Sequence, residues 1–278
     1  MLTTYYQNTA TYLRFNHQRT PNPVAMDFHL HNEFEIYFFI AGNVRYFIEK
    51  NVYPLRSGDI LLMNNHEIHR PTFGPGVYER MTLHFDPQLI RAVCPPGVNL
   101  LQCFTERSKG EGNQLNLQPS QVEKVYQLLE QIERVELQFG EAAPVLRLTY
   151  LIELLAYINK AFASVQPEPP EPVTVPEKLA PVLDYIDANL DGDLTLEALE
   201  RQLYINRFHL SRVFKQYTGS SIHEYIVYKR ISRAKKLLAE GFNVTEACQL
   251  AGFRDYSNFI RVFKKATGVA PGKYKRGN

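Results

Sequence analysis

The sequence lacks the features of a membrane-spanning, secreted or zinc-ribbon protein. No apolar run approaches the ~20 residues needed to cross a bilayer, and the opening stretch MLTTYYQNTATYLRF is polar where a signal peptide has an uninterrupted apolar core. The three cysteines, Cys94, Cys103 and Cys248, form no Cys-x-x-Cys pair and leave one over from any disulfide. We therefore expect a cytoplasmic protein with ordinary thiols.

Charge is distributed unevenly along the 278 residues, although the formal net charge is only +2. Residues 201–278 hold 16 Lys and Arg against 4 Asp and Glu, whereas residues 1–200 hold 15 basic and 25 acidic residues. Positive charge concentrated in one segment is typical of a polyanion binder, because each neutralised phosphate releases a counterion. Taken alone, it also fits a basic solvated helix face.

The hydrophobic pattern changes along the N-terminal half. Across residues 28–85, short apolar runs such as FEIYFFIAG and ILLM alternate with turn signals, which predicts an antiparallel β-sandwich or barrel. Two helices are predicted next, at 120–139 and 144–162, with Ser120 and Glu123 as a capping box for the first. The second helix is apolar on most of its circumference and needs cover on more than one side.

A proline-rich stretch, VQPEPPEPVTVP at residues 165–176, marks a domain boundary. Its five prolines exclude a helix and favour an extended spacer. The predicted fold is a two-domain α+β chain, with an N-terminal domain at 1–164, the linker at 165–176 and an all-helical domain at 177–278.

The helical domain contains one unit twice. RVFKQYTG at 212–219 recurs as RVFKKATG at 261–268, and in each copy this helix follows a shorter one after a tight turn. Thr195 and Asn206 are N-cap candidates in the first copy, and a capping box begins at Asn243 in the second. This is a helix-turn-helix pattern, and two recognition helices held ~34 Å apart would enter successive major grooves of DNA. A lone pattern more often marks an ordinary helix pair, but duplication together with the charge favours DNA binding.

The stretch from Lys178 to Arg276 resembles the DNA-binding domain of the AraC/XylS family. The resemblance is strongest in RISRAKKLL and in AGFRDYSNFIRVFKKATGVAPGKYKR. It implies two helix-turn-helix motifs joined by a long helix, a role in transcription as activator or repressor, and commonly an N-terminal effector domain. Glu200 and Cys248 stand where the family usually has a small alanine in the first helix of each motif.

Outward-facing side chains of the two recognition helices are the candidate DNA contacts. Arg212 and Arg261 are equivalent, and the guanidinium fork suits guanine O6 and N7. Lys215 and Lys264 lie one turn further on and suit phosphate. The candidates are Arg207, Phe208, Ser211, Arg212 and Lys215 in the first helix and Tyr256, Ser257, Ile260, Arg261 and Lys264 in the second, with His209 and Asn258 as second choices.

The N-terminal domain resembles the cupin-type effector domains of many AraC relatives, through FHLHNEFEIYFFIAG and SGDILLMNNHEIHRP. His29, His31 and Glu35 match the spacing of the first metal-cupin motif, and His69 takes the place of its third histidine. Three imidazoles and a carboxylate could hold a divalent ion, so a metal-dependent cupin enzyme fused to a DNA-binding domain is the alternative function. Against it, the second motif lacks its usual proline, glycine and closing asparagine.

We favour a pocket without metal, cofactor or catalytic role that binds a small polar effector at the mouth of the barrel. The family resemblance implies a sugar or sugar derivative. The candidate ligand-binding residues are His29, His31, Glu35, His69, Tyr37 and Arg45. The histidines could instead only satisfy neighbouring backbone groups. The helices at 120–139 and 144–162 are the candidate homodimer surface, or they cover the barrel.

Overall fold

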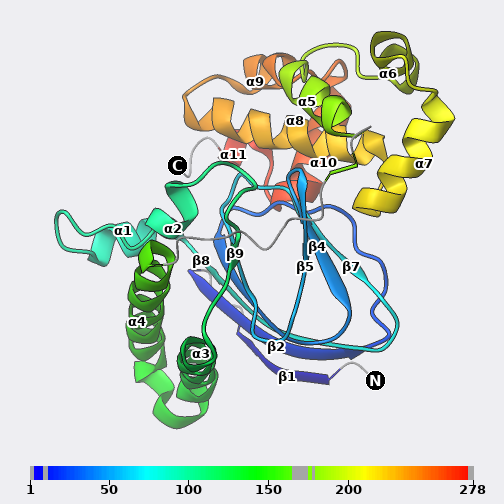
Figure 1. Cartoon of the computed structure of the whole chain (residues 1–278). Coiled ribbons are helices and arrows are strands. Elements are labelled where there is room, and N and C mark those ends of the chain that lie inside the picture. Colours follow the sequence, from blue (N-terminus) through cyan, green and yellow to red (C-terminus); the bar gives the residue numbers. More distant parts are fainter. Residues whose placement is uncertain (1–2, 9–11, 165–174, 177–178, 275–278) are drawn as a thin grey trace.

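The computed structural model describes residues 3–8, 12–164, 175–176 and 179–274. Its N-terminal domain consists of two antiparallel sheets (Figure 1). The strands are β1 (Thr3–Asn8), β2 (Leu13–Pro21), β3 (Phe34–Ala41), β4 (Val44–Ile48), β5 (Asn51–Pro54), β6 (Ile60–Met63), β7 (His69–Phe73), β8 (Val77–Phe85) and β9 (Gln114–Leu115). The larger sheet has the order β1-β2-β8-β3-β6-β9 and the smaller β5-β4-β7. The antiparallel β prediction is confirmed, and β1, β2 and β9 extend it beyond the predicted range.

The two faces of the larger sheet have different neighbours. Along β8, Met81, Leu83 and Phe85 are fully buried in a core that the sheet shares with the long helices of this domain. Thr82 and His84 alternate with them and point to the other face, because successive side chains of a strand point in opposite directions. That other face meets the smaller sheet, and the two together form what we call the barrel.

Two long antiparallel helices pack on the outside of the barrel, after two short ones. The helices are α1 (Pro87–Val93), α2 (Gln102–Thr105), α3 (Pro119–Phe139) and α4 (Ala143–Ser164), with a 3₁₀ turn at Gly140–Ala142. The predicted capping box at Ser120 and Glu123 is wrong. Gln118 caps the helix with Gln121 at the third position, because Pro119 is preorganised for the first helical position.

The most apolar face of α4 covers the larger sheet. Leu151, Leu154, Leu155 and Ile158 have no exposed surface and share their core with the strands and α3. The structure therefore shows α3 and α4 covering the barrel, which is one of the two roles predicted for them. None of the described helices is both long enough and apolar enough to cross a membrane.

The C-terminal domain is helical and contains both expected helix-turn-helix motifs. Its helices are α5 (Ala180–Ala188), α6 (Leu196–Leu203), α7 (Arg207–Thr218), α8 (Ile222–Ala239), α9 (Val244–Leu250), α10 (Tyr256–Thr267) and α11 (Pro271–Tyr274). The caps at Thr195, Asn206 and Asn243 are confirmed by hydrogen bonds to the first turns. Residues 165–174 of the predicted linker lie outside the described residues.

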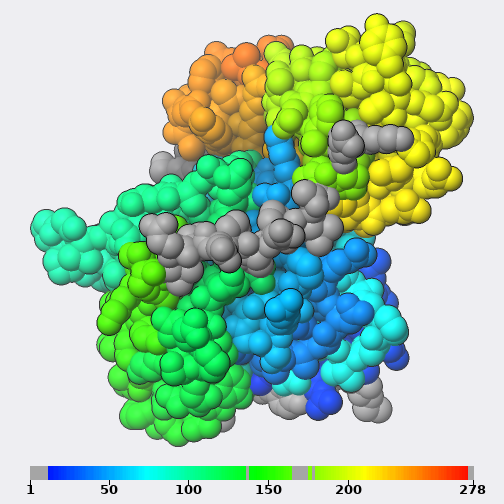
Figure 2. Space-filling model, viewed as in Figure 1, coloured from blue at the N-terminus to red at the C-terminus, as the bar shows by residue number. Residues whose placement is uncertain are grey.

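The two domains are in direct contact and share one hydrophobic core (Figures 1 and 2). Phe28 and Phe47 of the barrel pack against Tyr225 of α8, at ring-centroid distances of 5.8 and 6.2 Å. Lys50 of the barrel forms ion pairs with Asp184 and Asp187 of α5, at 2.7 and 3.1 Å. The helical domain is therefore seated on the barrel by packing and charge.

Candidate functional site

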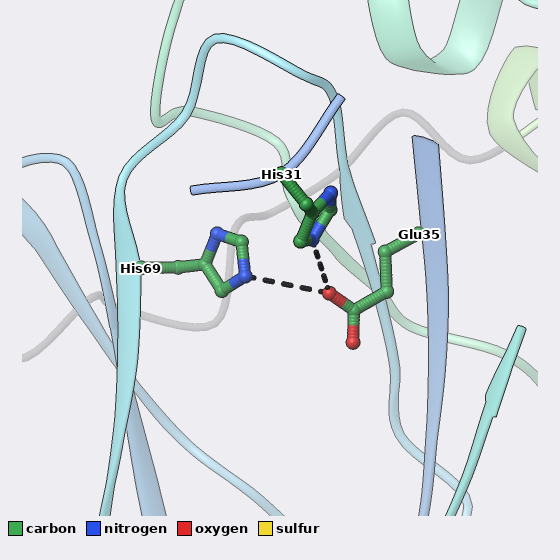
Figure 3. Close-up of side chains that lie close together, drawn as sticks. All are labelled: His31, Glu35 and His69. Atoms are coloured by element: carbon green, nitrogen blue, oxygen red, sulfur yellow. Dashed lines mark hydrogen bonds and ion pairs between the residues drawn. The ribbon is translucent and has the colours of Figure 1, made fainter. Parts of the chain in front are cut away.

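A cluster of histidines surrounds one carboxylate on the inner face of the larger sheet, and Figure 3 shows two of them, His31 and His69, beside Glu35. Glu35 is on β3, and His84 lies directly opposite it on β8. His69 begins β7 and pairs through its backbone with His29. His31 precedes β3 and reaches back to the same carboxylate. The structure therefore brings together the four predicted residues His29, His31, Glu35 and His69, and adds His84.

Three imidazoles converge on a single carboxylate oxygen. The Nε2 atoms of His31, His69 and His84 lie 2.8, 3.3 and 3.5 Å from Glu35 Oε2. The His29 ring stands edge-on to His69, with 4.1 Å between the centroids. Glu35 and His69 are buried, at 3% and 0% exposure.

The backbone fixes the ring orientation of two of these histidines. Nδ1 of His31 lies 2.8 Å from the Glu33 carbonyl, and Nδ1 of His69 lies 2.8 Å from the Glu67 carbonyl. A carbonyl only accepts, so both Nδ1 atoms donate, and Nε2 of a neutral ring then presents a lone pair. Both lone pairs would face the lone pairs of Glu35, and Nε2 of His69 finds no well-aligned hydrogen-bond partner among the residues that the structure describes. The arrangement therefore requires positive charge at its centre, either an additional proton or a bound cation.

Electrostatics keep the Glu35 carboxyl ionised. Burial alone would raise its pKa, but His84, His31 and His69 hold the pKa well below its usual range. Burial, with the charge of His69, holds the pKa of His29 well below its usual range, so this ring stays neutral.

The donor set also fits a divalent cation. The nitrogen and oxygen atoms that His31, Glu35 and His69 offer all lie within 4.8 Å of one another. Two imidazoles and a carboxylate are ligands that zinc and iron accept, and the Nδ1 hydrogen bonds orient the rings as in known metal sites. A metal ion seated ~2.0–2.2 Å from each donor would push His31 Nε2 and Glu35 Oε2 apart from their present 2.8 Å.

The barrel interior continues this polar region below the histidines. Tyr37 is buried there, and its hydroxyl lies 2.9 Å from that of Tyr78. Tyr46 stacks on His69, with 6.0 Å between the ring centroids, and the Arg80 guanidinium lies 4.9 Å from the Tyr78 ring centroid.

The structure does not bring the predicted ligand residue Arg45 to this cluster. Arg45 is exposed on β4 between the buried residues Val44 and Tyr46, so strand alternation turns it outward. His84, Arg80 and Tyr78 were not predicted, although the same alternation in YERMTLHF places them together on the inner face of β8.

The recognition helices α7 and α10 expose most of the candidate DNA contacts. Phe208 at the start of α7 is 73% exposed and Tyr256 at the start of α10 is 47% exposed. Arg212, Lys215, Ser257, Arg261 and Lys264 are also exposed, whereas Arg207, Ser211 and Ile260 are half-buried. Tyr204, in the turn before α7, was not predicted and is 95% exposed in a left-handed conformation with φ 55°.

The two equivalent arginines are held in the same way. Arg212 Nη2 lies 3.2 Å from His209 Nδ1, and Arg261 Nη2 donates to Asn258 Oδ1 at 2.7 Å. In both helices the partner is the residue one turn earlier, so each guanidinium is oriented before any ligand arrives. His209 and Asn258, the second choices, thus lie beside the predicted base-reading side chains.

Arg207 is in a different situation from Arg212. Its guanidinium forms ion pairs with Glu197 and Glu200 of α6, at 2.7 and 3.9 Å. The Glu200 carboxylate also accepts from the Arg207 backbone N–H at 3.1 Å. The glutamate at the position where an alanine is usual therefore joins α6 to the start of α7.

Helix α8 is tied to the loops that carry the histidines. Lys235 Nζ donates to the backbone carbonyls of His31 and Asn65, at 2.8 and 2.5 Å. Ser232 Oγ donates to the His66 carbonyl at 2.8 Å. Because α8 packs against both α7 and α10, a short chain of contacts connects the cluster to both recognition helices.

Two family models match the chain. The model described as AraC-like ligand binding domain matches residues 12–155, and the model described as helix-turn-helix domain matches residues 199–277. The multiple antibiotic resistance protein MarA of Escherichia coli is 32% identical over 98 residues, which are 35% of this chain and 77% of MarA. The transcriptional activator Btr of Bacillus subtilis is 25% identical over 84% of this chain and 42% of Btr.

Other relatives are longer or more distant. The chain spans only 12% to 34% of the length of three further curated relatives, among them the regulatory protein PocR of Salmonella typhimurium. A solved structure of ToxT from Vibrio cholerae with an unsaturated fatty acid bound aligns over 97% of both chains, with 14% identity and a TM-score of 0.39.

Proposed function

Because the chain belongs to the AraC family of DNA-binding transcriptional regulators, we propose that α7 and α10 read duplex DNA and that a small polar effector in the barrel controls this reading. The observation that carries the proposal is the repeated pair of exposed, preoriented arginines, Arg212 and Arg261. Each stands on the recognition helix of its own motif, and α8 joins the two motifs within one chain. One chain then reads two sites without two-fold symmetry.

Salt dependence tests the DNA-binding part on the full chain. If the recognition helices and their lysines neutralise ~4 phosphates, log Kd should rise with log salt with a slope of ~3.6, so doubling the salt weakens binding ~12-fold. Fluorescence anisotropy on labelled duplexes at several chloride concentrations measures the slope. A chain that does not bind duplex DNA at low salt, or binds it independently of salt, would contradict the proposal.

The effector site is the cluster of His31, Glu35, His69 and His84, continued by the polar residues below it. Its alternating donors and acceptors suit a polyhydroxylated molecule, and we propose a sugar or sugar derivative as the ligand class. The carboxylate and ring nitrogens would each bond a hydroxyl. No catalytic role is assigned to these groups.

Calorimetry with a panel of mono- and disaccharides tests the site. We expect one class to bind the wild type saturably and His31→Ala to weaken this binding by ~10- to 100-fold, because it removes the ring that bonds Glu35. Arg45→Ala is the matched control and should stay within about twofold, since Arg45 is exposed on the outer side of β4.

The same titrations in the presence of a chelator separate the alternatives. Equal binding to wild type and to His31→Ala would place the pocket elsewhere. A stoichiometric metal whose removal abolishes binding would favour a metal-dependent effector site. Turnover of a bound sugar would favour the metal-dependent cupin enzyme.

Docking of the helical domain on the barrel is the proposed route of control. An effector that shifts His31 alters the loop whose carbonyl Lys235 holds, and so changes how α8 sits on the barrel. A coupling of ~1–3 kcal/mol is typical of such two-site control. The same proposal includes a homodimer formed through the exposed sides of α3 and α4. It also includes a cytoplasmic location, which binding to chromosomal DNA requires.

A further inference from the structure

A cavity of about 470 Å³ lies between the barrel and α8, apart from the histidine cluster. Its barrel side is formed by the loop with Asn64 and His66 and by Lys109. Its other side is formed by α8, with Arg233 and Lys236 one turn apart. Ligand sites often lie at such domain junctions, and this volume is in the usual range for a small molecule.

The lining of this interdomain cavity carries surplus positive charge. Among the described residues it contains Lys109, Lys229, Arg233 and Lys236 but only one carboxylate, that of Asp187. Asp187 is engaged by Lys229 at 2.7 Å. A further carboxylate, Glu49, is buried behind the wall and is shared by Lys229 and Lys109, at 2.7 and 3.0 Å.

Within the described part of the chain, two of the cations have only distant partners. Arg233 lies 3.8 Å from Asp191 and Lys236 lies 3.8 Å from Glu240, and both partners are outside the cavity lining. Burial and the nearby charges of Lys235, Lys109 and Lys236 lower the pKa of His66 to about 4, as expected where positive potential accumulates. His66 is therefore a neutral hydrogen-bonding group in this wall.

We propose that this interdomain cavity binds a small organic anion with at least two negative charges, such as a phosphate ester. A guanidinium beside an ammonium suits a phosphoryl group, with the arginine fork bidentate on its oxygens. The anion contacts Lys109 of the barrel and Arg233 and Lys236 of α8 at the same time. It thereby stabilises the docked arrangement of the domains. It also fixes the position of α8, which links the two helix-turn-helix motifs. This site is independent of the effector pocket in the barrel.

Isothermal titration of the full chain with inorganic pyrophosphate, at ionic strength held constant with chloride, tests the site. We expect saturable binding of one pyrophosphate per chain. Lys109→Gln and Lys236→Gln should each weaken it by ~10-fold, because each removes a cation from a different domain. Lys160→Gln, which removes one positive charge from the exposed side of α4, is the matched control and should stay within about twofold.

Lys109→Arg keeps the charge and should retain binding, which separates a lost contact from a folding defect of Lys109→Gln. A rise in melting temperature with pyrophosphate, present in the wild type and absent in Lys236→Gln, gives a second readout. The proposal is overturned if pyrophosphate does not bind, if Lys160→Gln weakens it as much as Lys236→Gln does, or if Lys109→Gln binds as the wild type does. DNA binding by the wild type without pyrophosphate is measured separately, so failure here is distinct from failure of the proposed function.

Discussion

Arg212→Ala and Arg261→Ala are each expected to weaken binding to the specific DNA site by ~1–3 kcal/mol, and to relax sequence preference at different base pairs about one helical turn apart. Each guanidinium is exposed and is oriented by the residue one turn earlier, His209 or Asn258. Each variant should therefore lose base discrimination as well as one positive charge. The double variant should lose both preferences, with effects that add because the sites are independent.

Binding selections with each variant against a randomised duplex measure these preferences. Lys264→Ala should weaken all sequences alike, because a lysine one turn further along α10 suits phosphate. Arg201→Ala is the matched control, since it removes an exposed arginine from α6 and should leave the preference unchanged. If both arginine variants change preference at the same base pairs, the model with two separate grooves is wrong.

Lys229→Met is expected to lower the free energy of unfolding by ~3–5 kcal/mol, because it leaves a buried carboxylate without its main partner. Lys229 of α8 is 6% exposed, and it joins Glu49 of the barrel to Asp187 of α5, at 2.7 Å each. Of its partners among the described residues, the Glu49 carboxylate would keep Lys109 and the Ile68 backbone N–H. The change should also loosen the seating of α8 on the barrel.

Urea unfolding followed by circular dichroism measures this loss. Adding Glu49→Gln to Lys229→Met should recover part of it, because the unpaired buried charge is then removed. Lys160→Met on the exposed side of α4 is the matched control and should change the stability by less than ~0.5 kcal/mol. A loss in Lys229→Met no larger than that of the control would show that this ion pair does not hold the domains together.

The same ion pair predicts how stability depends on pH. Burial alone would raise the pKa of Glu49, but Lys109 and Lys229 lower it from 4.5 to about 2. A carboxyl whose pKa is lowered on folding contributes stability that is fully present above about pH 4.5 and is lost as the pH falls toward 2. The difference between wild type and the Glu49→Gln variant should therefore narrow over that range, and a constant difference would contradict the assignment.

Local features of the helical domain followed from the sequence by itself. The caps at Thr195, Asn206 and Asn243 depend on hydrogen bonds to residues two or three positions away, so neighbouring residues are enough to set them. The repeat also placed Arg212 and Arg261 on equivalent faces, because both arginines open the same eight-residue pattern. The predicted N-cap of α3 at Ser120 is wrong, because Gln118, two residues earlier, occupies that position.

Contacts between distant segments were decided only by the tertiary structure. His84 joins the histidine cluster because β8 pairs with β3 in the register that sets it opposite Glu35, and Arg45 leaves it because β4 turns that side chain outward. Lys229 meets Glu49 across 180 residues of sequence. Composition and periodicity describe which face of an element is buried, but pairing register and domain docking depend on how all the buried faces fit together, and only the folded chain determines that.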